Sequence, residues 1–241
     1  MKKNYLLAMV ASTILIASSS AKAQYSDLEI GVQAGGYFYQ GDLTKSALGT
    51  LKKPKPGFGV FIAKDLSSHI TLKANADYFQ LEASDMEFGS EAWKNNRNLS
   101  FKTNVFDVSV RALVNIRDNY SEDISFRPFL FGGVGASFIK VERDYANFNT
   151  PYYTNREKWV LPGLQQDIAT NTPKAALNIP VGIGFKYALN SSLSIVTEGS
   201  YRFMFTDYLD GFSKVAHSKK DHFYSVSIGF SLAIGNDGYY Y

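Results

Sequence analysis

Eight stretches of this 241-residue chain alternate apolar residues with polar or small ones at a period of two, and turn residues bound each stretch. Such alternation is typical of a β-strand with two different faces, because successive side chains of a strand point to opposite sides. Most stretches reach the length of about 9–11 residues that a tilted strand needs to cross a bilayer, and the second is marginal. The predicted strands are 28–40, 57–64, 70–80, 101–117, 126–141, 176–189, 193–205 and 222–234.

The connections between these stretches alternate in length along the chain. Short connections are predicted at 65–69, 118–125 and 190–192, and long polar connections at 41–56, 81–100, 142–175 and 206–221. Outer-membrane barrels show this pattern, with short periplasmic turns and long extracellular loops. An even number of strands also places both termini on the periplasmic side. We therefore predict an all-β fold, an eight-stranded antiparallel up-and-down transmembrane β-barrel in a bacterial outer membrane.

The alternation alone does not decide which face of the strands is outside. A soluble eight-stranded barrel of the lipocalin type turns its apolar face inward. Here the polar faces are rich in glycine and serine, which suits a crowded interior better than a solvated surface. Aromatic residues also gather near strand ends, as in the two interfacial girdles of a membrane barrel, so we predict the membrane arrangement. The predicted girdle residues are Tyr37, Phe38, Tyr39, Tyr78, Phe79, Tyr201, Phe203 and Phe205 toward the long connections, and Phe126, Phe129, Phe131 and Tyr187 toward the short ones.

The polar faces carry four acidic and four basic side chains. The interior of an eight-stranded barrel is just wide enough for side chains to fill it, and charges buried there must be paired. An ion path or proton relay would show an excess of one sign, so we predict a salt-bridge network that fills the lumen. The residues are Glu29, Lys73, Asp77, Asp107, Arg111, Lys186, Glu198 and Arg202.

The N-terminal segment has the features of an export signal. Lys2 and Lys3 precede a mostly apolar stretch over 5–17, and a small-residue cleavage site ends at Ala23. The apolar stretch is shorter than the roughly 20 residues of a membrane-spanning helix. We predict two regions: a signal peptide over 1–23, and an outer-membrane β-barrel over 24–241.

Charge and cysteine content exclude several functions. The segment 1–23 holds three lysines and no acid, so the remaining chain carries 22 basic and 22 acidic residues. This balance predicts no nucleic-acid partner, since nucleic-acid binding needs a concentrated basic face. The chain has no cysteine, which excludes disulfides, thiol catalysis, thiolate metal ligands and a lipoprotein anchor.

Catalytic candidates are few. The histidines are His69, His217 and His222. Ser218, Asp221 and Ser225 lie near the last two in sequence, which leaves open a rim site of the kind used by lipid A-modifying barrels. No spacing of a nucleophile and a base is diagnostic, and Asp207 and Asp210 fit a turn at a strand end better than a cation site. We predict a non-enzyme with no catalytic, cofactor-binding or metal-ligating residue and no cofactor.

Four segments resemble the PorG family of outer-membrane barrels associated with the type IX secretion system. They are GGYFYQGDL at 35–43, PFLFGGVGA at 128–136, PVGIGFKY at 180–187 and EGSYRFMFTDYLD at 198–210. The resemblance implies a non-enzymatic barrel that anchors or assembles the secretion machinery. The partners that it implies are outer-membrane lipid and periplasmic secretion-machinery proteins, without nucleic acid or a small-molecule substrate.

A second class of function remains open, in which the long loops act. The barrel would then be a small OmpA/OmpX-like protein that serves membrane integrity, adhesion or ligand binding, or a lipid A-modifying rim enzyme. The third long connection offers an aromatic surface for an external partner, although its aromatic residues could equally pack on one another and cap the barrel. These residues are Tyr145, Phe148, Tyr152, Tyr153 and Trp159.

Overall fold

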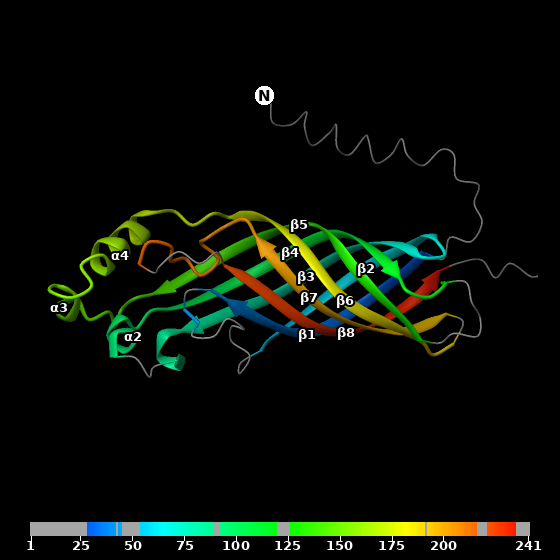
Figure 1. Ribbon diagram of the computed structural model, residues 1–241, viewed down its shortest axis with the longest axis horizontal. Coiled ribbons are helices and arrows are strands. Elements are labelled where there is room, and N and C mark those ends of the chain that lie inside the picture. The colour runs from blue at the N-terminus through cyan, green and yellow to red at the C-terminus, as the bar shows by residue number, and fades with distance from the viewer. Residues whose placement is uncertain are drawn as a thin grey trace, which may run out of the picture.

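Eight antiparallel strands form a closed barrel in the order of the chain (Figure 1). The computed structural model describes residues 28–41, 43–44, 54–88, 92–119, 126–190, 192–215 and 221–234. The predicted fold class is confirmed, because each strand pairs with its neighbours in sequence and the first strand closes the barrel on the last. The strands are β1 (Leu28–Gln40), β2 (Lys55–Ser67), β3 (Ile70–Ser84), β4 (Ser100–Asn115), β5 (Phe126–Asp144), β6 (Ala175–Ala188), β7 (Leu193–Met204) and β8 (His222–Ile234).

The strand boundaries follow the period-two pattern closely, with deviations of a few residues at both ends of the barrel. The bounds of β1 and β8 are those predicted, whereas β2 is longer at both ends than 57–64. The strands β3 and β5 continue to Ser84 and Asp144, beyond the predicted ends at 80 and 141. The predicted signal peptide 1–23 lies outside the described residues, as do His217 and Ser218.

Short helices lie in two of the long connections, where we expected only polar loops. The 3-10 helix η1 (Asp85–Phe88) and α2 (Ala92–Arg97) join β3 to β4, and α3 (Thr150–Tyr153) and α4 (Val160–Ala169) join β5 to β6. Asn149 starts α3, because its side-chain oxygen accepts a hydrogen bond from the backbone N–H of Tyr152 at 3.2 Å. The labelled helices α2, α3 and α4 gather at one end of the barrel (Figure 1). No helix among the described residues is long and apolar enough to cross a membrane.

The outer face of the barrel is apolar. On β8, Val226, Ile228 and Phe230 are each more than half exposed, while Ser227 and Gly229 between them are buried. An aromatic row at the long-loop end pairs Tyr78 with Phe106 and Phe106 with Phe138 across the ladders of β3, β4 and β5. The next outward row on the same strands, at 80, 104 and 140, is polar.

The height of the apolar outer face matches a membrane. The exposed Phe106 on β4 and Ile116, one residue past the end of β4, mark the two ends of this face and are ten positions apart. At about 3.3 Å per residue and a strand tilt of roughly 40°, this separation gives an apolar band of about 25 Å. That is the height of the apolar band of outer-membrane barrels, so the fold is of the outer-membrane type with its apolar face outward.

The girdle prediction is wrong for five aromatic residues, which point into the lumen. They are Tyr37, Tyr39, Phe79, Phe129 and Phe131, and each is at most 6% exposed. The reason is the phase of the strand, since these residues lie an even number of positions from inward polar residues such as Gln33 and Asp77. The other predicted girdle residues lie on the outer face, and among them Tyr78, Phe126, Tyr187, Phe203 and Phe205 are 43–63% exposed.

Candidate functional site

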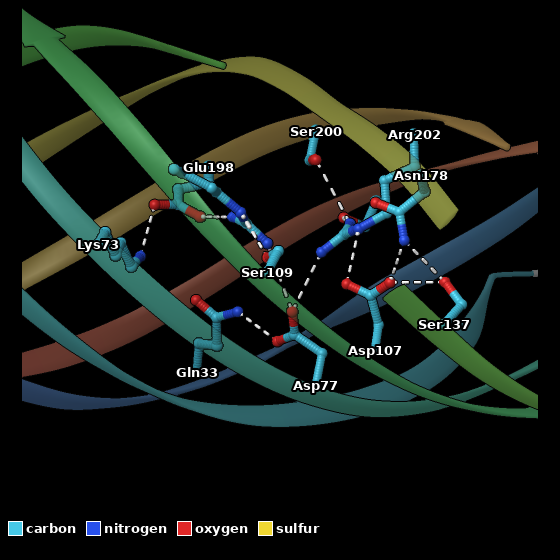
Figure 2. A network of polar contacts seen from close by, with 12 residues as sticks. Gln33, Lys73, Asp77, Asp107, Ser109, Ser137, Asn178, Glu198, Ser200 and Arg202 are labelled. Carbon is cyan, nitrogen blue, oxygen red and sulfur yellow. Dashed lines mark hydrogen bonds and ion pairs between the residues drawn. The ribbon is translucent and has the colours of Figure 1, made fainter. Parts of the chain in front are cut away.

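Two basic side chains lie directly opposite each other in the lumen and share one carboxylate. Lys73 on β3 is the register partner of Arg111 on β4. From the far wall, Glu198 on β7 contacts both cations, with 2.6 Å between its Oε1 and Lys73 Nζ and 3.1 Å between its Oε2 and Arg111 Nη1. One acid therefore offsets the repulsion between two adjacent bases and joins opposite walls of the barrel (Figure 2).

Four positions further along the same strands, the charges are reversed. Asp77 on β3 is the register partner of Asp107 on β4. Arg202 on β7 contacts both carboxylates, through Nη2 to Asp77 Oδ2 at 3.1 Å and through Nε to Asp107 Oδ1 at 3.2 Å. Arg111 Nη2 lies 3.5 Å from Asp77 Oδ2 and connects the two halves. We call the six residues Lys73, Asp77, Asp107, Arg111, Glu198 and Arg202 the central network.

Neutral side chains complete the hydrogen bonds of the central network. Gln33 donates to Asp77 Oδ1 at 2.5 Å, and Asn178 and Ser137 donate to Asp107 Oδ2 at 2.7 and 2.6 Å (Figure 2). The two other predicted charges, Glu29 and Lys186, pair with each other near the short turns. All eight predicted charges are therefore paired inside the barrel, which confirms the predicted salt-bridge network.

An apolar layer covers the central network on each side. Toward the long loops, Tyr37 stacks on Phe79 with 3.9 Å between ring centroids, and Phe79 packs on Phe223 at 5.0 Å. Toward the short turns, a buried cluster contains Phe61, Leu113, Phe129, Phe131 and Val196. Rings of both layers face the cations of the network: Lys73 lies over Phe61, Arg111 over Phe131 and Arg202 over Phe223.

Glycine provides the room for these inward rings. Four inward glycines lie opposite an aromatic residue on the neighbouring strand. At Gly182, an added Cβ would come within 2.4 Å of the Phe131 ring and 2.1 Å of the Gly199 carbonyl oxygen. The glycine-rich segments thus let large rings lie flat against the inner wall. The pairs are Gly31–Phe61, Gly57–Phe79, Gly182–Phe131 and Gly184–Phe129.

The described parts of three long connections, 85–88 with 92–99, 145–174 and 205–215, fold together at the end of the barrel, and we call them the cap. A buried ion pair fixes the first of them, with Arg97 Nε 2.7 Å from Asp85 Oδ2 and Arg97 Nη2 2.6 Å from Asp85 Oδ1. Burial alone lowers the pKa of Arg97, but the hydrogen bonds and charge of Asp85 outweigh burial and raise this pKa above its ordinary value. The arginine therefore stays charged in the cap.

A second buried carboxylate joins the other two connections of the cap. Asp167 on α4 accepts hydrogen bonds from the backbone N–H groups of Ser213, Lys214 and Val215, at 3.2, 2.9 and 2.9 Å to Oδ2. Arg143 on β5 donates to the carbonyl oxygens of Asp167 and Gly211. Polar contacts over long sequence separations thus hold the cap in one arrangement.

The apolar core of the cap is continuous with the upper layer of the lumen. Tyr39, Phe101 and Phe223 of the strands belong to one buried cluster with residues from the long connections. Those residues are Leu43, Leu99, Tyr153, Val160, Leu164, Leu209, Phe212 and Val215. Of the aromatic residues predicted as an external surface, Tyr153 is buried, and Phe148, Tyr152 and Trp159 pack against this cluster. Tyr145 is 39% exposed, so most of this set closes the barrel.

Among the described residues considered for a rim catalytic site, His222 is not brought together with Asp221 and Ser225. His222 lies on the outer face beside Tyr201 and Phe203, with ring centroids 5.6 and 5.7 Å away. Asp221 and Ser225 are buried on the inner side, because alternate positions of β8 face opposite sides of the wall. His69 lies between β2 and β3, at the short-turn end.

The two aspartates of the segment 206–210 have structural contacts inside the cap. Asp210 Oδ2 lies 2.7 Å from the Tyr39 hydroxyl oxygen, and Asp207 accepts a hydrogen bond from Ser213 at 2.8 Å. In the part of the chain that the structure describes, no group of three or more His, Cys, Asp or Glu side chains could hold a metal ion. The described geometry therefore offers a lumen filled by side chains and a cap held by buried polar contacts.

These features define an eight-stranded barrel of the outer-membrane type with a closed lumen. The chain belongs to the family described as Domain of unknown function (DUF6089), which matches residues 5–240. No curated protein matches the sequence.

Similar solved structures include three outer-membrane proteins. Neisserial surface protein A has a TM-score of 0.47 at 9% identity, over 88% of this chain and 100% of that chain. The same values apply to Ail, the attachment invasion locus protein of Yersinia pestis, in complex with the heparin analogue sucrose octasulfate. The outer membrane enzyme PagL has a TM-score of 0.39 at 8% identity, over 86% of this chain and 99% of that chain.

Proposed function

We propose that this protein is a non-enzymatic, non-conducting outer-membrane barrel that acts at the cell surface through its cap. The observation that carries the proposal is the cap itself, in which the buried pair of Asp85 and Arg97 fixes one connection and buried Asp167 joins the other two. Loops that only cross from strand to strand need no such contacts, whereas a recognition surface benefits from being held in one shape. The function is of the OmpA/OmpX-like kind, in adhesion, ligand binding or membrane integrity.

The proposed orientation places the cap outside the cell and the short turns and both termini in the periplasm. The alternation of long and short connections supports this orientation. We also propose that residues 1–23 are a cleaved signal peptide and that the mature protein begins at Gln24. The intact mass of the protein purified from outer membranes tests the cleavage site, and retention of residues 1–23 would contradict it.

The cap is tested in a deletion strain that receives one of three alleles. The first is wild type, the second replaces 146–173 by a short Gly-Ser linker, and the third replaces the β6–β7 turn at 190–192. We expect the deletion and the cap allele to share a defect in adhesion or membrane integrity, while the turn allele behaves as wild type. Equal activity of the cap allele and wild type would overturn the proposal.

A second candidate function is the assembly of the type IX secretion machinery, which the resemblance to the PorG family supports. The most specific of the resembling segments, 198–210, has structural roles in this chain: Arg202 joins the central network and Asp210 contacts Tyr39 in the cap. This candidate therefore ranks second. It predicts that the deletion strain loses secreted cargo from its surface, that the turn allele shares this loss, and that periplasmic proteins co-purify with the barrel.

A further inference from the structure

One cation stands out on the apolar outer face of the barrel. In the described strands, the outward positions between the aromatic row of Tyr78, Phe106 and Phe138 and the short turns are apolar or uncharged, with the exception of Lys64 on β2. Lys64 is exposed, and its register partners Leu28 and Leu72 are apolar. None of the ion pairs between described residues includes it. The charge of such a residue needs either a partner or access to the membrane interface, so Lys64 is a candidate contact for an anionic group there.

An open apolar groove of about 660 Å³ lies over β8, β1, β2 and β3, and Leu193 at the start of β7 also lines it. The groove opens on the outer face, because its outward lining side chains on β1 and β2 are 44–57% exposed; Gly31 and Phe61, which lie between them in sequence, also line it. On β3 the lining residues Ala74 and Ala76 are small, which lowers the surface there. The side chains that line the groove include Ile30, Val32, Val60, Ile62, Ala74 and Ala76.

The cation and the groove are next to each other and face the same way. Ile62, which lines the groove, precedes Lys64 by two positions on β2, a rise of about 7 Å along one face of the strand. From Lys64 the strand continues three residues to its end at Ser67, about 10 Å along the strand. The long side chain of Lys64 can therefore extend its ammonium group to the membrane interface at the short-turn end.

We propose that this surface binds one glycerophospholipid of the periplasmic leaflet, with its phosphate at Lys64 and an acyl chain in the groove. The charge of Lys64 complements an anionic phosphate, and the groove complements a hydrocarbon chain. The choice of the periplasmic leaflet rests on the orientation given under Proposed function, in which the short turns face the periplasm. The binding site itself is separate from the cap.

The probe is dioleoylphosphatidylglycerol, titrated into the full mature barrel in a non-ionic detergent and followed by native mass spectrometry. We expect one lipid to bind at least tenfold more tightly than any later one. Lys64→Gln and Ala74→Phe should each weaken this first binding about tenfold, the first by removing the charge and the second by filling the groove. Ala112→Phe places the same ring on the outer face of β4, outside the groove, and should bind as wild type.

Three results would overturn the proposal. The first is that wild type, Lys64→Gln and Ala74→Phe bind the first lipid equally tightly. The second is that dioleoylglycerol, which lacks the phosphate, binds as tightly as dioleoylphosphatidylglycerol. The third is that protein taken from outer membranes preferentially retains lipid A. Each variant is first checked for the change in gel mobility on boiling that a folded barrel shows, so a folding defect is recognised separately. The cap allele tests the proposed surface function without changing Lys64. The lipid site and the surface function of the cap can therefore be disproved separately.

Discussion

Asp77 and Asp107 lie directly opposite each other on β3 and β4, with both carboxylates fully buried in the lumen. Like charges at facing positions destabilise a ladder, and this pair is tolerated because Arg202 reaches both from β7. The neighbouring pair of bases, Lys73 and Arg111, is held in the same way by Glu198. The stability of this barrel therefore depends on contacts across the lumen as well as on its ladders.

Removing Arg202 alone should lower the stability of the barrel more than removing the charges of Arg202, Asp77 and Asp107 together. Arg202→Met leaves Asp77 and Asp107 buried without their common partner, and we expect a loss of about 3–5 kcal/mol in the free energy of unfolding. In the triple variant Arg202→Met, Asp77→Asn, Asp107→Asn, most of this loss should be recovered. Urea unfolding of the barrel in lipid vesicles measures both. An Arg202→Met protein as stable as wild type would show that the contact across the lumen is dispensable.

Inward and outward glycines should respond differently to the same small substitution. Gly182→Ala brings a methyl group against the Phe131 ring and the Gly199 carbonyl oxygen, and should cost about 1–3 kcal/mol in stability. Gly199→Ala is the matched control on β7, because nothing lies within 4 Å of its added Cβ. We expect the unfolding temperature, followed by gel mobility, to fall for Gly182→Ala alone. Equal unfolding temperatures for the two variants would contradict the packing described here.

The cap should open while the barrel stays folded when the Asp167 carboxylate is removed. Asp167→Ala leaves the backbone N–H groups of Ser213, Lys214 and Val215 without their carboxylate, at a cost of about 1–3 kcal/mol. Hydrogen exchange should then become faster over 160–169 and 205–215 while the strands remain protected. Asp144→Asn is the control, because Asp144 is exposed and bonds only locally to the Ala146 N–H. Unchanged exchange in Asp167→Ala would mean that the cap is held by its apolar core alone.

The intact protein should not conduct ions. Two apolar layers and the paired central network fill the lumen, and a charge in transit would have to displace them. We expect no steady current steps from purified protein in planar lipid bilayers under conditions where a wide porin conducts. Reproducible steps of a single size would contradict a closed lumen.

The sequence was sufficient to predict the barrel, whereas it left the cap as one of two alternatives for the aromatic residues of the third long connection. Period-two alternation predicts both the strands and the inward charges, since each strand must present one face to lipid and the other to the lumen. The same phase could have placed Phe79 beside Asp77 inside the barrel, but the clustering of aromatic residues near strand ends suggested a girdle instead. Contacts such as Asp167 with Val215 join residues 48 positions apart, and no local periodicity marks them.

The shared core of cap and lumen has a consequence for immune recognition. Because Leu164 and Phe212 pack in the same cluster as Tyr39 and Phe223, the cap has its shape only when the barrel is folded. Its epitopes are therefore conformational and assembled from several connections at once. Antibodies raised against a peptide from a single connection should bind the native protein poorly, whereas antibodies raised against the whole folded barrel should recognise it.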